Sequence, residues 1–171
     1  MIWRLFRAFI VVFPIALIIA WLFQEKLIFF PHRLEIAPDP MPIPGRVQEK
    51  ITFRSSDGLT LHGLWIGRAI DPASIASATP AGATMTTAFG TSGDATGLPP
   101  RLTVLFSHGN AGHLWHRWTR LAALSRLPVD IFIYDYRGFG QSAGQPTVAG
   151  VVLDGVAALD YLEHIRGIPR D

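Results

Sequence analysis

Residues 130–146 read "DIFIYDYRGFGQSAGQP", a strand-like run that leads into a glycine-rich loop. The first seven residues form a short apolar run with β-branched and aromatic side chains, which is typical of a buried strand. The loop contains Gly140-Gln141-Ser142-Ala143-Gly144, which matches the G-x-S-x-G signature of a serine nucleophile on a sharp strand-to-helix turn. Ser142 is therefore the first candidate to weigh as a catalytic nucleophile.

The surroundings of Ser142 argue against that role. A nucleophile elbow requires a strand that runs directly into the motif and a helix that starts immediately after the serine. Here the strand pattern stops at Tyr136, and the cap-like Thr147 places the next helix five residues beyond Ser142. We interpret the stretch as a structural loop in which Gly138 and Gly140 adopt positive φ and Ser142 forms local hydrogen bonds.

A second strand and helix lie upstream of this stretch. "LTVLFS" (residues 102–107) has the composition of a strand buried in a parallel sheet, and apolar residues at helical spacing follow it until Pro128. Between them, the turn His108-Gly109-Asn110-Ala111 could present backbone N–H groups at the start of the helix, with Asn110 or Ala111 donating to an oxyanion. An ordinary loop with Asn110 as the helix N-cap fits the local sequence equally well.

The order of these patterns predicts an α/β fold with a right-handed parallel crossover. An antiparallel hairpin is predicted before them in "RVQEKITFRSSDGLTLHGLWI" (residues 46–66), with Asp57-Gly58 at the turn. A helix capped by Thr147 is predicted after the glycine-rich loop. Its expected apolar face consists of Val148, Val151, Val152, Val156, Leu159, Leu162 and Ile165.

Residues 1–26 are predicted to form a signal anchor, a transmembrane helix that contacts membrane lipid through residues 2–23. The segment is apolar except for Arg4 and Arg7, whose long side chains could snorkel and lengthen a 16-residue apolar run. A cleaved signal peptide is the alternative, but no A-x-A-like site follows. The positive charge before the span slightly exceeds that of Lys26 and Arg33 after it, which predicts a single-pass protein with a cytoplasmic amino terminus and the domain on the opposite side.

Two further segments complete the predicted domain organisation. Residues 27–46 carry five prolines and are predicted to be an extended connector. The partial α/β domain is predicted to span residues 47–171. Within it, residues 69–100 are rich in Ala, Thr, Ser, Gly and Pro, and they are predicted to be a flexible insertion because they cannot bury enough apolar area.

The composition of the 171-residue chain restricts its chemistry. Apolar types make up 49% and charged types 16% of the residues, the net charge is +2, and there is no basic block, so nucleic-acid binding is not predicted. The absence of cysteine excludes disulfides, thiol nucleophiles and cysteine-zinc sites. His108, His113 and His116 form an H-x4-H-x2-H pattern, but no acidic residue or further histidine lies nearby to complete a metal site. The glycine spacing of the loop also departs from G-x-G-x-x-G, and we predict neither a metal nor a cofactor.

Together, "VLFSHGNAG", "IYDYRGFGQSAGQP" and "LDGVAALDYL" resemble the first half of an α/β-hydrolase, most similar to the membrane-anchored Bem46-type group related to serine aminopeptidase-like hydrolases. The resemblance covers Leu27 to Asp171 apart from the insertion. It implies an oxyanion hole at His108, Gly109, Asn110 and Ala111. It also implies a loop that borders the active site and contains Asp135, Arg137, Gly138, Gly140 and Ser142. It further implies that the nucleophile elbow follows a fifth strand, with the acid and the base later still.

The family's chemistry is acyl transfer by a serine, a histidine and an acidic residue, with backbone N–H groups holding the oxyanion. Because the chain ends before all three triad residues, we expect the N-terminal part of a serine hydrolase, inactive alone, that acts on a small ester or amide once the domain is completed. A truncated gene product or an incomplete record is expected, and the 102–107 strand should pair with the 130–136 strand and leave an exposed edge. The alternatives are a catalytically inactive, membrane-tethered interaction module and a small α/β binding protein unrelated to hydrolases.

Overall fold

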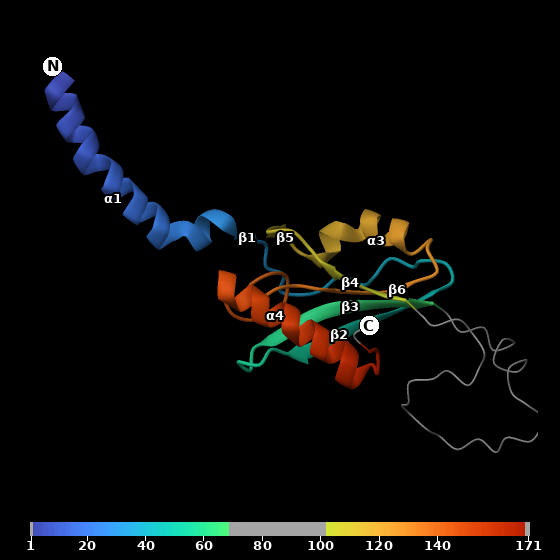
Figure 1. The fold of residues 1–171 in the computed structure, drawn as a ribbon. Helices are drawn as coiled ribbons and strands as arrows, with labels where there is room; N and C mark the ends of the chain where they lie inside the picture. Colours follow the sequence, from blue (N-terminus) through green and yellow to red (C-terminus); the bar gives the residue numbers. More distant parts are fainter. Residues whose placement is uncertain (1, 69–101, 170–171) are drawn as a thin grey trace, which may run out of the picture.

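A four-stranded mixed sheet lies between helices, and a long amino-terminal helix, α1 (Ile2–Ile28), leads away from it (Figure 1). This computed structural model describes residues 2–68 and 102–169. The segment predicted to be a flexible insertion, residues 69–100, lies outside the described residues. The strand order in the sheet is β2-β3-β6-β4, so the strands are not neighbours in the order in which they occur along the chain.

The predicted hairpin is confirmed. Strand β2 (Arg46–Arg54) pairs antiparallel with β3 (Thr60–Arg68) along its whole length. Gly58 at the turn has a φ of 84°, a conformation that residues with a Cβ rarely adopt. The alternation in β2 buries Ile51 and Phe53 and leaves Val47 exposed, because the sheet is covered by a helix only toward the turn end of this strand.

The two predicted parallel strands are also present and lie side by side. Strand β4 (Thr103–Ser107) pairs parallel with β6 (Asp130–Tyr134), and β6 pairs antiparallel with β3 on its other side. Every residue of β6 is buried, as expected for a central strand. Strand β4 is the edge of the sheet within the described residues and is only partly buried, as expected for a strand that pairs with residues 130–136 on one side and leaves its other edge exposed.

Side chains of the central strand alternate between two apolar cores, one on each face of the sheet. Ile131 and Ile133 pack on one face with residues of the short 3-10 helix η1 (Leu114–Arg117) and of α3 (Trp118–Leu124). Phe132 and Tyr134 pack on the other face, which is covered by α4 (Val148–Asp160) and its π-helical continuation η2 (Tyr161–Ile165). Each fully buried large apolar side chain contributes about 1.5–3 kcal/mol relative to an exposed one, so the two cores hold the sheet and its helices together.

Helix α4 buries a different face from the predicted one. Thr147 caps the helix as expected, since its Oγ1 accepts a hydrogen bond from the backbone N–H of Gly150 at 2.9 Å. The predicted apolar face is wrong, however, because Val152 is 61% exposed whereas Asp154 is fully buried. Small residues, including Ala157 and Ala158, bring the helix close to the sheet, and the Asp154 carboxylate has a charged partner there.

Helix α1 is long and apolar enough to cross a membrane. Its segment Phe9–Ile28 has 20 residues, a mean hydropathy of 1.9 and no part buried against the rest of the protein. Pro14 lies inside this helix. After α1, strand β1 (Phe30–Pro31) pairs parallel with β5 (Ala111–Gly112). The proline-rich segment therefore contacts the turn that follows β4 instead of hanging free between α1 and the sheet.

Candidate active site

Two of the predicted site segments meet at one edge of the sheet. Because β4 and β6 are parallel neighbours, the turn after β4 and the loop after β6 both begin at the carboxyl ends of the strands, where ligands of α/β sheets usually bind. His108 and Asp135, the first residues beyond these strands, are both buried, and His108 Nε2 lies 3.0 Å from Asp135 Oδ1. The other ring nitrogen, Nδ1, lies 2.7 Å from the carbonyl oxygen of Gly109. Both ring nitrogens of His108 thus face an oxygen atom, and the contact of Nε2 with Asp135 is a close approach without hydrogen-bond geometry.

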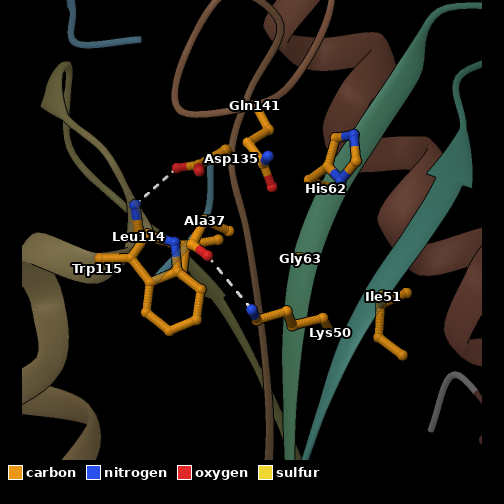
Figure 2. A pocket seen from close by; sticks show the side chains of 9 residues that line it. All are labelled: Ala37, Lys50, Ile51, His62, Gly63, Leu114, Trp115, Asp135 and Gln141. Carbon is orange, nitrogen blue, oxygen red and sulfur yellow. Dashed lines mark hydrogen bonds between the residues drawn. The ribbon is translucent and has the colours of Figure 1, made fainter. Parts of the chain in front are cut away.

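Asp135 also determines where the next helix begins. Its Oδ1 accepts a hydrogen bond from the backbone N–H of Leu114 at 2.6 Å, as Figure 2 shows. The expectation that the helix opens at the His-Gly turn, with Asn110 as its N-cap, is wrong. Helical structure starts only at Leu114, because Ala111 and Gly112 first pair with the chain after α1.

The turn itself nevertheless presents unpaired donors. Gly109 and Asn110 are exposed, and within residues 2–68 and 102–169 no acceptor is found for their backbone N–H groups. The Asn110 side chain points back to the connector, where its Nδ2 donates to the carbonyl oxygen of Ile28 at 2.7 Å. Ala111 belongs to strand β5. The N–H groups of Gly109 and Asn110 can thus stabilise an oxyanion without breaking an existing hydrogen bond.

Ser142 has the structural surroundings that its sequence context predicts. It is fully buried, its Oγ donates to the carbonyl oxygen of Asp135 at 2.7 Å, and the same Oγ accepts from the backbone N–H of His62 at 3.0 Å. A nucleophile must be exposed to substrate and activated by a base. Ser142 instead ties the glycine-rich loop to the ends of β6 and β3.

Two glycines allow the loop to turn back over Asp135. Gly138 and Gly140 have φ values of 80° and 50°, as the sequence predicts for this loop. A Cβ on Gly140 would lie only 2.0 Å from Asp135 Oδ2, so no larger residue fits there while the carboxylate keeps its position. The loop backbone thus shields the carboxylate that holds His108.

Arg137 joins this loop to α4 and to the hairpin. Its Nε and Nη2 donate to Asp154 Oδ1 at 3.0 and 2.8 Å, its backbone N–H donates to Asp154 Oδ2 at 2.7 Å, and its Nη1 donates to Asp57 Oδ2 at 2.8 Å. Hydrogen bonds to Asp154 in particular raise the pKa of Arg137, and the hydrogen bond from Arg137 lowers the pKa of Asp57. Arg137 is a structural cation, because its charge is already neutralised inside the protein.

The cavity beside Asp135 is small (Figure 2). Its lining residues come from the connector, the hairpin, η1 and the glycine-rich loop: Ala37, Lys50, Ile51, His62, Gly63, Leu114, Trp115, Asp135 and Gln141. Its volume of about 20 Å³ is enough for a water molecule but not for an organic substrate. A substrate that uses the donors at Gly109 and Asn110 must therefore approach the turn from its exposed side.

A larger hollow lies between the connector and the glycine-rich loop. It has a volume of about 380 Å³, within the range of small-molecule sites. Lys26, Phe29 and Arg33 line it from the connector side, and Gly138 and Pro146 line it from the loop side. Arg33 also donates a hydrogen bond to the carbonyl oxygen of Gly144, so the connector is attached to the loop next to this hollow.

Three histidines gather near the site, and they are not the three of the sequence pattern. His113 and His116 lie together, but His108 contacts Asp135, and the third member of the cluster is His32 from the connector. Burial, followed by the neighbouring His116, lowers the pKa of His113 from its ordinary value of 6.5. Sequence reasoning missed His32 because only the pairing of β1 with β5 brings it there.

Comparisons with known proteins agree with this architecture. No protein-family model matches the chain. The uncharacterized protein YfhR of Salmonella typhi is 32% identical over 136 residues, which are 80% of this chain and 37% of that protein. The α/β-hydrolase domain-containing protein WAV2 of Arabidopsis thaliana is 31% identical over 160 residues, 90% of this chain and 42% of that protein. Protein bem46 of Schizosaccharomyces pombe is 44% identical over 66 residues, 37% of this chain and 22% of that protein.

Among solved structures, the esterase Pf2001 of Pyrococcus furiosus aligns with a TM-score of 0.53 and 16% identity, over 80% of this chain and 41% of that chain. The fold and these relatives therefore place the chain in the α/β-hydrolase class. Within that class it belongs to the Bem46-like family. The chain spans less than half the length of the curated relatives it matches.

Proposed function

We propose that this chain is the amino-terminal part of a membrane-anchored serine hydrolase that cleaves a small ester or amide by acyl transfer. The observation that carries the proposal is the turn after β4, where the buried His108 lies against Asp135 while, within the described residues, the exposed N–H groups of Gly109 and Asn110 have no acceptor. A developing oxyanion requires a pair of donors of this kind, held at the carboxyl end of a rigid strand. The nucleophile, the acid and the base are assigned to sequence beyond this segment.

The proposed location is a membrane, with α1 as the anchor. A helix rises 1.5 Å per residue, so its 20-residue apolar segment is about 30 Å long, the thickness of the hydrocarbon core. Trp3 and Trp21 are exposed near the two ends of residues 2–23, where interfacial aromatic residues are favoured. We place the amino terminus in the cytoplasm and the sheet on the opposite side, from the distribution of basic residues.

The proposal is tested by expressing the complete open reading frame and treating it with a fluorophosphonate probe, which labels activated serines. The complete protein is expected to be labelled and to hydrolyse a p-nitrophenyl ester, and Ser142→Ala is expected to leave the specific labelling of the folded protein unchanged. The chain of residues 1–171 is expected to remain unlabelled. Labelling of residues 1–171 that disappears in Ser142→Ala would contradict the proposal.

The oxyanion donor is tested by a matched pair of variants at Asn110 in the complete protein. Asn110→Pro removes the backbone N–H, and we expect kcat to fall about 10²–10³-fold, the usual cost of losing one such donor. Asn110→Ala keeps the N–H and removes only the side-chain bond to Ile28, so kcat should change little. Equal activities in the two variants would show that this N–H is not the donor.

The exposed edge of β4 favours one alternative, a catalytically inactive interaction module. Within the part of the chain that the structure describes, β4 pairs with β6 on one side only, and an unpaired strand edge can bind an extended segment of a partner. A complete protein that folds, stays unlabelled by the probe and co-purifies with one defined partner would support this alternative over the hydrolase.

A further inference from the structure

We propose that His32, His113 and His116 form a binding site for a divalent transition-metal ion, with Zn²⁺ as the expected occupant. One nitrogen from each of these three side chains lies within 4.8 Å of the others. The rings of His113 and His116 are stacked with centroids 3.7 Å apart, and the ring of His32 lies 5.4 and 5.6 Å from them. Each of the three imidazoles thus offers one nitrogen that could reach a shared ion.

The backbone holds the three histidines together from separate segments. His32 donates its N–H to the carbonyl oxygen of Gly112 at 3.3 Å, and its own carbonyl oxygen accepts from the N–H of Gly140 at 2.9 Å. The N–H of His116 donates to the carbonyl oxygen of His113 at 3.1 Å. These contacts attach the connector both to the turn before η1 and to the glycine-rich loop, so the histidine cluster is built from fixed positions.

Gly112 makes room for one of the rings. A Cβ at this position would lie 2.5 Å from His116 Nδ1, and the φ of 78° is one that residues with a Cβ rarely adopt. The His116 ring therefore occupies the space that a side chain at residue 112 would take. Close approach of this kind brings the His116 ring over the backbone of the β5 turn and keeps it beside His113.

The burial of His113 gives an independent sign of a ligand. His113 is 5% exposed, and no partner for its Nδ1 is found within the described parts of the chain. A buried polar atom without a partner lowers the stability of the fold, and coordination or a bonded ligand at the cluster would remove that penalty. His32 and His116 are exposed, so an ion can reach the cluster from solvent.

The donor set selects the class of metal. Three neutral imidazole nitrogens suit Zn²⁺ and other borderline metals, whereas Mg²⁺ and Ca²⁺ prefer oxygen ligands. Three histidines and one water would complete a tetrahedral zinc site. Zn–N bonds are about 2.0–2.1 Å long, so small side-chain rotations would draw the three nitrogens onto the ion.

The proposed site is separate from the oxyanion turn but adjoins it. Its ligands do not include His108, which contacts Asp135. A Cβ at Gly140 would lie 3.5 Å from the Cβ of His113 and even closer to Asp135, so the cluster borders the loop that shields Asp135. A bound ion would fasten the connector to this loop, and its effect on stability is expected to be larger than any effect on chemistry.

The test is a titration of the full chain with Zn²⁺ alone, in detergent micelles and without a polyhistidine tag, measured by calorimetry. We expect one ion per chain. We also expect His32→Ala and His116→Ala each to weaken Zn²⁺ binding by at least about 10-fold, because removing even a group that hydrogen-bonds a metal ligand usually costs that much affinity. Co²⁺ should give the visible absorption of a tetrahedral site with nitrogen ligands. His113 is left unchanged because its replacement could prevent folding.

The control variant is His164→Ala. His164 lies with Asp160 and Glu163 in a different group that could also bind a cation, and it should not affect Zn²⁺ binding if the proposal is right. The proposal would be overturned if His164→Ala abolished binding, if His32→Ala and His116→Ala both bound as the unchanged chain does, or if Zn²⁺ did not bind at all.

Discussion

Ser142 shows how one residue can carry a catalytic signature and serve the fold. Its Oγ satisfies the carbonyl oxygen of Asp135 and the N–H of His62 at the same time, in a position without solvent. Both bonds connect strand ends that must be aligned before the turn after β4 can be held in place. The role of Ser142 is therefore structural: its hydroxyl holds the ends of β6 and β3 together beside the glycine-rich loop.

Ser142→Ala is expected to lower the free energy of unfolding by about 1–3 kcal/mol, because a buried backbone donor and acceptor lose their partner. The matched control is Ser56→Ala at the exposed hairpin turn, which should change the stability by less than about 0.5 kcal/mol. Thermal unfolding of the detergent-solubilised chain measures both. Equal stability of the two variants would contradict the assigned role.

Gly140 is required for a steric reason as well as a conformational one. Gly45→Ala tests the conformational part alone, because Gly45 has a φ of 71° and open space around it, and we expect a cost of about 1–2 kcal/mol. Gly140→Ala should cost at least about 1–3 kcal/mol more, since its Cβ would collide with Asp135. The difference between the unfolding temperatures of Gly140→Ala and Gly45→Ala measures the cost of the collision with Asp135. Equal unfolding temperatures would mean that Asp135 can move aside without cost.

At the scale of elements, the Arg137–Asp154 pair determines which face of α4 is buried. The apolar residues of this helix alone would favour burial of the face with Val152. Asp154 is buried instead, because its carboxylate forms an ion pair with the buried guanidinium of Arg137. A buried charge without a counter-charge is far more costly than an exposed valine. The ion pair therefore sets the rotation of the helix, and Ala157 and Ala158 allow the close packing that results.

Asp154→Ala is expected to destabilise the protein by about 3–5 kcal/mol, because it leaves Arg137 buried without its main partner. Asp57→Ala removes the half-exposed partner of the same guanidinium and should have a clearly smaller effect. The comparison is made by thermal unfolding of the full chain. If Asp154→Ala were no more destabilising than Asp57→Ala, the rotation of α4 would need another explanation.

Asp57 gives the hairpin a dependence on pH. The hydrogen bond from Arg137 lowers the pKa of Asp57 from 3.8 in the folded chain, so its contribution to stability is present above pH 3.8 and is lost as the pH falls through the lower folded value. Asp57→Asn should therefore be less stable than the unchanged chain at neutral pH, and the difference should shrink on acidification below pH 3.8. Asp39, whose pKa Lys50 lowers at the surface, provides the control variant Asp39→Asn, which should show the same trend more weakly. A constant difference at all pH values would exclude this link.

For the whole molecule, the main feature is the position of the apolar helix α1 relative to the turn after β4. Strand β1 follows α1 after one residue and pairs with β5, which places the end of the apolar helix beside the turn that carries the proposed oxyanion donors. A membrane at α1 would therefore hold that turn close to the lipid surface. If α1 is the proposed anchor, the proposed hydrolase would meet its substrate near a bilayer.

Membrane anchoring is tested by alkaline extraction of membranes from expressing cells. The unchanged chain should stay in the membrane fraction, and the double variant Leu17→Arg, Ile18→Arg should be released. Each arginine at the centre of a span costs about 2.5–3.5 kcal/mol on insertion scales. Neither residue touches the sheet, since both are exposed in α1. Release of the unchanged chain would contradict an anchor.

Local sequence was enough to place the hairpin, the two parallel strands, the Thr147 cap and the positive φ of Gly138 and Gly140, because turn chemistry, periodicity and capping act between residues close in the chain. Three features depended on the tertiary structure: the burial of Asp154, the start of η1 under Asp135, and the meeting of His32 with His113 and His116. In each of them at least one partner lies well over ten residues away in the sequence, so local patterns do not bring the groups together. Only the folded sheet brings those groups together.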